Sequence, residues 1–186
     1  THEAFRTVPT DKSKLWTKET VAAKMAAADD FKANATADQV YYSEKIPFAY
    51  DYADDDPDVF PSYSSHGTHV AGIVAGQSDY VVNEETQEKF IGVAPEAQLV
   101  ICKVFTDNLD RDGIGGADTI DIISAVSDCV ALGVDVINMS LGSSAGFAEE
   151  GDGNKIDKLI NEVYSKVKAA GISLVVAASN DYSSGY

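Results

Sequence analysis

The second half of the sequence alternates short apolar runs with longer segments that carry apolar residues at helical spacing. Residues 97–105 form a nearly unbroken apolar run, and residues 134–140 and 172–178 are rich in Val, Ile and Ala. The first run is typical of a strand that is covered on both faces, the second predicts another buried strand, and the third predicts a further strand. Between them, residues 120–133 and 156–171 have the helical period, and a glycine ends each segment. Because such strands and helices form right-handed crossovers, the sequence predicts an α/β fold of three layers, with helices on both faces of a mostly parallel sheet.

The first half of the chain is less regular but fits the same fold class. Residues 17–31 are rich in Ala and predict a surface helix, whereas residues 41–52 place Ile46, Phe48, Tyr50 and Tyr52 at alternating positions and predict a strand. Residues 54–61 form an acidic loop bounded by proline, and residues 77–89 form a polar surface excursion. No linker divides the 186 residues, so we expect one domain.

Charge and composition exclude several classes of partner. The net charge of −16 disfavours nucleic acid and anionic membrane surfaces as partners. No apolar run approaches the roughly 20 residues that span a bilayer, so no membrane insertion is expected. The two cysteines, Cys102 and Cys129, are too few for the disulfide framework of a small secreted scaffold, and we expect two free buried thiols.

One segment, Ser64–Gly76, begins in a loop rich in Pro, Asp and Ser and continues in small and apolar residues. This pattern predicts a helix that starts at the surface and enters the core, with Ser64 or Ser65 as its cap. The dipole at a helix N-terminus favours the neutral imidazole, so His66 is suited to act as a base. From residue types alone, a surface histidine and a catalytic base are equally good interpretations of His66. Gly72 and Gly76 predict close packing against a neighbouring element.

Cation binding is a second interpretation of the same region. The aspartates of residues 54–58 offer clustered oxygens of the kind that calcium prefers, although a solvated loop explains them as well. His66 and His69 lie three residues apart and share one face of the predicted helix, but they lack the H-E-x-x-H pattern of zinc hydrolases. The sequence therefore establishes no bound metal or cofactor, and calcium is the one ion that the acidic loop could bind.

A sequence motif around His66 favours the catalytic interpretation. His-Gly-Thr-His-Val-Ala-Gly, residues 66–72, resembles the histidine motif of subtilisin-like serine proteases. The resemblance implies that His66 is the general base and that His69 is a buried structural companion. It also implies a subtilisin-like fold and a protein or peptide as substrate.

Three further segments resemble this family in the expected order. Residues 135–142 resemble the strand that ends at the substrate cleft, which implies that Ser140, Leu141 and Gly142 bind an extended peptide. Residues 112–115 resemble the opposite wall, which implies a substrate-binding role for Gly113 and Gly115. Residues 175–181 resemble the strand before the oxyanion-hole asparagine, here Asn180, although the family usually has Gly where this chain has Ser179.

Two members of the family's Asp-His-Ser triad have no counterpart in the sequence. No Asp-x-Gly turn follows a strand before His66, and no Gly-Thr-Ser-x-Ala motif is present. His2-Glu3-Ala4-Phe5-Arg6 resembles the segment just after that turn, which implies that the triad aspartate precedes Thr1. Residues 1–186 are thus expected to form a partial, incomplete catalytic domain that is inactive by itself and that complementary fragments of the same protease could complete.

Within the family, the chain is most similar to cell-envelope subtilases, the lactocepin-type proteinases and the peptidases that cleave complement peptides. The His-Glu-Ala-Phe start, the Ile46-Pro47-Phe48 strand and the ending at residues 179–184 carry this resemblance. It implies a secreted serine endopeptidase associated with the cell envelope.

Other function classes stay open at this point. A non-catalytic peptide-binding module could keep the subtilase scaffold and capture peptides at residues 140–142. A metal-binding domain could use the acidic loop together with His66 and His69. A dinucleotide-binding enzyme is disfavoured, because residues 113–116 lack a third spaced glycine and do not directly follow a strand.

Overall fold

The computed structural model describes residues 2–111, 115–142 and 155–178. Its elements follow the predicted alternation, and two short 3-10 turns at Glu3–Phe5 and Lys12–Lys14 precede them. The helices are α1 (Lys18–Ala27), α2 (Ala37–Val40), α3 (His66–Ala75), α4 (Thr119–Leu132) and α5 (Lys155–Ala169). The strands are β1 (Phe48–Asp51), β2 (Gln77–Asn83), β3 (Glu88–Ile91), β4 (Val100–Lys103), β5 (Val136–Met139) and β6 (Ser173–Val176).

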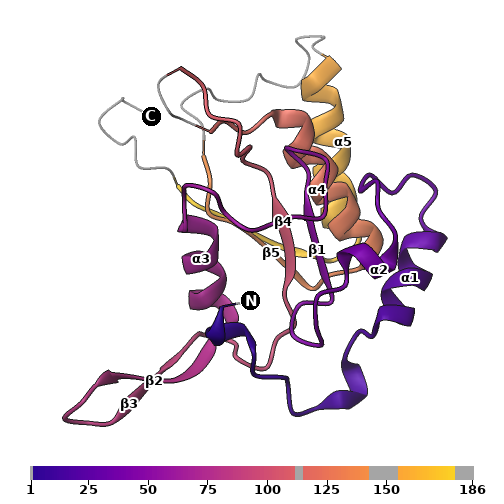
Figure 1. Cartoon of the computed structure of the whole chain (residues 1–186). Coiled ribbons are helices and arrows are strands. Elements are labelled where there is room, and N and C mark those ends of the chain that lie inside the picture. The colour runs from indigo at the N-terminus through magenta and orange to yellow at the C-terminus, as the bar shows by residue number, and fades with distance from the viewer. Residues whose placement is uncertain (1, 112–114, 143–154, 179–186) are drawn as a thin grey trace.

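The strands pair two by two. β1 pairs with β4 and β5 pairs with β6, both in parallel, while β2 and β3 form an antiparallel hairpin that projects from the body (Figure 1). The polar excursion expected at residues 77–89 is therefore largely this hairpin. Among the described residues, no ladder joins β4 to β5, so the parallel part of the fold consists of two separate two-stranded sheets.

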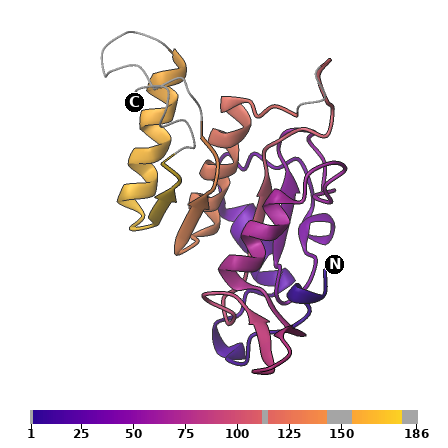
Figure 2. The same cartoon turned by 90° about the vertical axis from the view of Figure 1, so that its left-hand side faces the viewer.

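The β1–β4 sheet is covered on both faces. Phe48, Tyr50 and Val104 belong to a core that includes residues of α1 and α4. The alternate residue Ala49 packs with Ala75 of α3 on the other face. Figure 1 shows α3 and α4 on opposite sides of these strands, and Figure 2 shows α5 farther out than α4. This confirms the three-layer arrangement and the parallel strands.

The β5–β6 sheet is covered on one face only. Ile137 and Met139 pack with residues of α4 and α5, among them Val126 and Val163. On the other face Val136 is 58% exposed, and Val175 is 53% exposed. The prediction that residues 134–140 form a buried strand is thus wrong for one face of this sheet, because no described element covers that face.

Helix α4 spans both sheets. Its Ala125 and Leu132 belong to the core of the β1–β4 sheet, whereas Ile123 and Val126 belong to the core of the β5–β6 sheet. The helix begins where the Asp118 carboxylate accepts a hydrogen bond from the Ile120 amide at 2.9 Å, and it ends at Gly133 with φ of 71°. Within the described residues, none of the helices is long and apolar enough to cross a bilayer.

Candidate active site

Helix α3 carries the candidate general base at its first residue. Ser65 is the N-cap residue, and the Ser64 hydroxyl accepts a 3.4 Å hydrogen bond from the His66 backbone amide, as expected for a serine near a helix start. The stripe of Ala71, Val74 and Ala75 packs against the β1–β4 sheet. Since residues 66, 69 and 73 lie on the opposite side of a 3.6-residue helix, they are turned outward, and all three are exposed.

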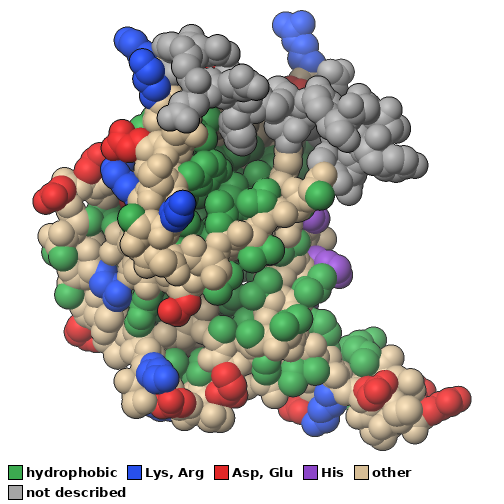
Figure 3. Space-filling view, turned by 180° about the vertical axis from the view of Figure 1, so that it is seen from behind, with side chains coloured by type: hydrophobic (Ala, Val, Ile, Leu, Met, Phe, Trp, Pro, Cys, Tyr) green, Lys and Arg blue, Asp and Glu red, His purple; other side chains and the backbone are tan. Residues whose placement is uncertain are grey.

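This orientation corrects one expectation. His69 is exposed rather than buried, because it lies on the outward face of α3, which no other described element covers. In Figure 3, histidine side chains border a hollowed, largely apolar region of the surface. Among the described residues, no side chain forms a hydrogen bond or an ion pair with the His66 imidazole.

Close packing fixes the position of α3, as its glycines predicted. A Cβ atom at Gly76 would lie 2.9 Å from the Phe90 ring and 2.8 Å from the Gly72 carbonyl oxygen. At Gly92, a Cβ atom would lie 2.6 Å from the same carbonyl oxygen. The Gly92 amide also donates a 2.7 Å hydrogen bond to the carbonyl of Gly76. The end of β3 thus lies directly against the C-terminal half of α3, with no room for a side chain at Gly76 or Gly92.

The loop before α3 is fixed by the loop after β4. A Cβ atom at Gly115 would meet the Tyr63 hydroxyl at 1.9 Å and the Thr106 carbonyl oxygen at 2.4 Å, so Gly115 is buried against the residues that precede His66. The Ser62 amide donates a 3.3 Å hydrogen bond to the Asp107 carboxylate. The predicted cleft residue Gly115 and the candidate base therefore belong to one connected region.

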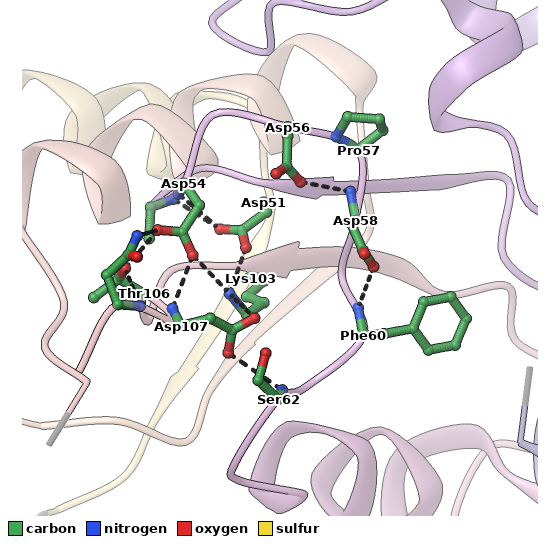
Figure 4. Close-up of polar contacts among 12 residues, drawn as sticks. Asp51, Asp54, Asp56, Pro57, Asp58, Phe60, Ser62, Lys103, Thr106 and Asp107 are labelled. Atoms are coloured by element: carbon green, nitrogen blue, oxygen red, sulfur yellow. Dashed lines mark hydrogen bonds and ion pairs between the residues drawn. The ribbon is translucent and has the colours of Figure 1, made fainter. Parts of the chain in front are cut away.

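Lys103 stands at the centre of this region (Figure 4). Its ammonium forms ion pairs with Asp51 and, at 3.4 Å each, with Asp54 and Asp107. The Lys103 side chain is only 13% exposed, and that of Asp51 is 2% exposed. Asp54 in addition accepts hydrogen bonds from the Thr106 hydroxyl at 2.5 Å and from the Asp107 amide at 2.8 Å.

The electrostatics of the cluster favour the charged forms of its outer members. Burial alone would lower the pKa of Lys103, but its ion pairs with the three aspartates raise that pKa above the ordinary value. Burial alone would raise the pKa of Asp107, but the hydrogen bonds from Ser62 and the charge of Lys103 lower it. The pKa of Asp54 is likewise lowered, since hydrogen bonds and Lys103 outweigh the effect of burial.

The same cluster bears on the expected cation site. Asp51, Asp54 and Asp107 hold carboxylate oxygens within 4.8 Å of one another, and they are the group of described residues that could hold a metal ion. The Lys103 ammonium forms ion pairs with all three carboxylates, so these residues form a lysine-centred ion-pair network. Calcium binding at this site stays a prediction. His66 and His69 are not part of any such group among the described residues.

Sequence reasoning did not single out Lys103. The signal was present, because a lone charged side chain inside the apolar run 97–105 has to find opposite charges if it is buried. The aspartates of residues 51–58 were the nearest candidates in the predicted neighbouring strand and loop. Only the parallel pairing of Asp51 with Lys103 across β1 and β4 brings them together.

The remaining predicted cleft residues are partly described. Ser140 and Leu141 directly follow β5 and are half-buried, and Gly142 is exposed. The Asn138 side-chain amide donates a 3.1 Å hydrogen bond to the Ser140 hydroxyl. Gly113 and Asn180 lie outside the described residues.

Comparison with known proteins agrees with this arrangement. A sequence profile of the subtilase family matches residues 19–186. The PI-type proteinase of Lactococcus lactis subsp. cremoris is 33% identical over 78% of this chain and 7% of its own length. The C5a peptidase of Streptococcus pyogenes serotype M3 is 33% identical over 99% of this chain and 14% of its own length. An intracellular serine protease of Paenibacillus polymyxa is 35% identical over 68% of this chain and 32% of its own length.

The chain thus spans a third or less of each of these relatives. The profile covers α1 to β6, including the histidine helix and both parallel sheets. The chain belongs to the subtilase family of serine proteases.

Proposed function

We propose that this chain is part of the catalytic domain of a serine endopeptidase that hydrolyses peptide bonds in proteins, with His66 as the general base. The observation that carries the proposal is the position of His66, exposed at the first turn of a rigidly packed helix and beside the loop of Gly115. In this role the imidazole accepts the proton of the nucleophilic serine and then delivers it to the leaving amine. Asn180 would donate a hydrogen bond to the developing oxyanion.

In the same proposal, the substrate binds as an extended strand between two walls. Ser140, Leu141 and Gly142 form one wall directly after β5, and Gly113 and Gly115 form the other. Backbone groups of such segments can pair with a peptide by strand addition, which is tolerant of side-chain identity.

His66 is tested in a longer polypeptide of the same gene that includes a serine nucleophile. Replacing the base of a catalytic triad lowers kcat by about 10⁶-fold, so His66→Ala should abolish cleavage of unfolded casein. The matched control is His69→Ala, which removes the other exposed imidazole of α3 and should retain most of the activity. Equal activity of His66→Ala and the parent polypeptide would refute the proposed base.

The 186-residue chain by itself is proposed to be inactive, because its sequence has neither an Asp-x-Gly turn before His66 nor a Gly-Thr-Ser-x-Ala motif. Purified chain should therefore give only background hydrolysis of casein. Robust cleavage that a serine-directed reagent inhibits would overturn this proposal. Two observations together would support the peptide-binding module instead. The chain would bind peptides, and the longer polypeptide of the same gene would have no Gly-Thr-Ser-x-Ala motif.

We also propose that complementary segments of the protease complete the sheet between β4 and β5. Each of these strands has a ladder on one side only among the described residues, and both lie under α4. Val100 and Cys102 of β4 pack against the cores of both sheets. Amide hydrogen exchange at β4 and β5 should slow in the longer polypeptide relative to this chain; unchanged exchange would contradict the added strand.

The location of the protein is proposed from its relatives. Proteinases of the PI type and the C5a peptidase support a secreted enzyme at the cell envelope, with proteins as substrates. Fractionation of the source cells, with an antibody against this chain, tests this location directly. Recovery in the cytoplasmic fraction alone would contradict it.

A further inference from the structure

The two cysteines of the chain lie side by side in the core. Cys102 of β4 and Cys129 of α4 have their Sγ atoms 3.8 Å apart, although 27 positions separate them in the sequence. Cys129 is buried and Cys102 is half-buried. The sequence has only these two cysteines, so each has one possible partner within the chain.

Other roles for this pair fit less well. Two thiolates are too few for a structural zinc site, which takes four ligands. The nearby Asp128 carboxylate is already engaged, because it accepts hydrogen bonds from the amides of Lys32 and Ala33 and from the Tyr52 hydroxyl. No group of described residues that could hold a metal ion includes either cysteine.

We propose that Cys102 and Cys129 are a redox modification site, at which an intramolecular disulfide reversibly fastens β4 to α4. The bond requires the sulfur atoms to approach from 3.8 Å to about 2 Å. The tether would act at a sensitive point, because Cys102 precedes Lys103 of the ion-pair network and packs against the cores of both sheets. This inference is independent of the proposed peptidase function.

The chemistry balances with a small disulfide, such as oxidised glutathione, as the oxidant. The more accessible Cys102 attacks as a thiolate, which breaks the glutathione disulfide and releases one glutathione, to which the proton passes. Cys129 then attacks the mixed disulfide, and the second glutathione leaves with the second proton. Two protein thiols are oxidised, and one glutathione disulfide is reduced to two thiols. The hydrogen bond with Cys129, together with burial, raises the pKa of Cys102, which makes the first step slow in the folded chain.

The test is thiol–disulfide equilibrium of the full 186-residue chain in mixtures of reduced and oxidised glutathione. Folded and denatured samples are brought to equilibrium and quenched by alkylation. The mass of the intact chain is then measured by mass spectrometry. The folded chain should lose the mass of two hydrogen atoms and take up no alkyl group, and reductant should reverse the change. Cleavage without reductant should yield one cross-linked pair of peptides, containing Cys102 and Cys129.

The equilibrium constant separates a native pair from a chance encounter. Closing a loop of this length is favoured in the folded state over the denatured state by roughly 10²–10³-fold when the native geometry fits the bond. By the same thermodynamic cycle, the oxidised chain should melt about 5–15 °C above the reduced chain. A constant that is equal or lower in the folded chain, or products that are only glutathione adducts or disulfide-linked dimers, would overturn the proposal.

Single variants provide the control. Cys102→Ala and Cys129→Ala should each stop at a mixed disulfide with glutathione and show no gain in melting temperature. The comparison of folded and denatured wild-type chain decides the question even where a variant fails to fold.

Discussion

Replacing Lys103 by Met removes the charge at the centre of the ion-pair network and keeps most of the aliphatic side chain. The change leaves Asp51, whose side chain is 2% exposed, without its cation. Breaking a buried pair from one side costs about 3–5 kcal/mol, since the remaining charge stays buried. Because whole domains are stable by only about 5–15 kcal/mol, Lys103→Met should remove roughly a fifth or more of the free energy of unfolding. The expected drop in melting temperature is about 6–20 °C.

Urea denaturation of the full chain measures this loss, and an exposed ion pair supplies the matched control. Lys89 pairs with Asp79 at 2.5 Å on the β2–β3 hairpin, where their side chains are 57% and 96% exposed. Lys89→Met should cost at most about 1 kcal/mol. In the double variant with Asp51→Asn, part of the stability should return, because the uncompensated charge is gone. A loss below about 1 kcal/mol for Lys103→Met would refute the reasoning, since Lys103 would then behave as a surface lysine.

Three further predictions concern the acid limb of stability, the packing of α3 and the buried carboxylate of α4. Because the pKa of Asp54 is lowered by folding, the advantage of the wild type over Asp54→Asn should be complete above about pH 4 and shrink as the pH falls through the folded pKa; a difference that does not change with pH in urea titrations would contradict this. Gly92→Ala should destabilise the chain by about 1–3 kcal/mol, because its Cβ would meet a carbonyl oxygen at 2.6 Å. In the same thermal melts, Gly67→Ala on the open surface should stabilise α3 by up to about 1 kcal/mol. Asp128→Ala should cost about 2–4 kcal/mol in urea denaturation, because two backbone amides and the Tyr52 hydroxyl lose their acceptor.

The sequence was sufficient for the α/β alternation and for the histidine helix. Periodicity alone located α4 and α5, because their apolar stripes face the two sheets. Gly133 marks the end of α4 with a positive φ, as a glycine after an apolar helix suggests. Close packing at Gly72 and Gly76 against a neighbouring element was also predictable, since glycine in a predicted helix costs stability unless it allows packing, whereas Phe90 as the partner was not.

Side-chain environment was less predictable than the elements themselves. The sequence of an apolar strand does not indicate which segment covers its second face. The exposure of Val136 and Val175 could therefore not be anticipated. His69 was wrongly expected to be buried for a similar reason. The family motif identifies the residue, but it does not specify which element covers its side chain. The ion pairs of Lys103 depend on the register of β1 against β4, which no local pattern specifies.

Among the described residues, the contacts that orient His66 come from one part of the fold. The stripe of α3 packs on the β1–β4 sheet, its glycines pack on the end of β3, and the preceding loop is held by Asp107 and Gly115. None of these contacts involves β5 or β6, whose second face is exposed. Changes on the β5–β6 side should therefore alter the cleft wall at Ser140–Gly142 without moving the base, whereas changes at Lys103 should reach His66 through Asp107 and Ser62. The candidate base is thus positioned by the lysine-centred network and by glycine packing, independently of the strand that we propose binds the substrate.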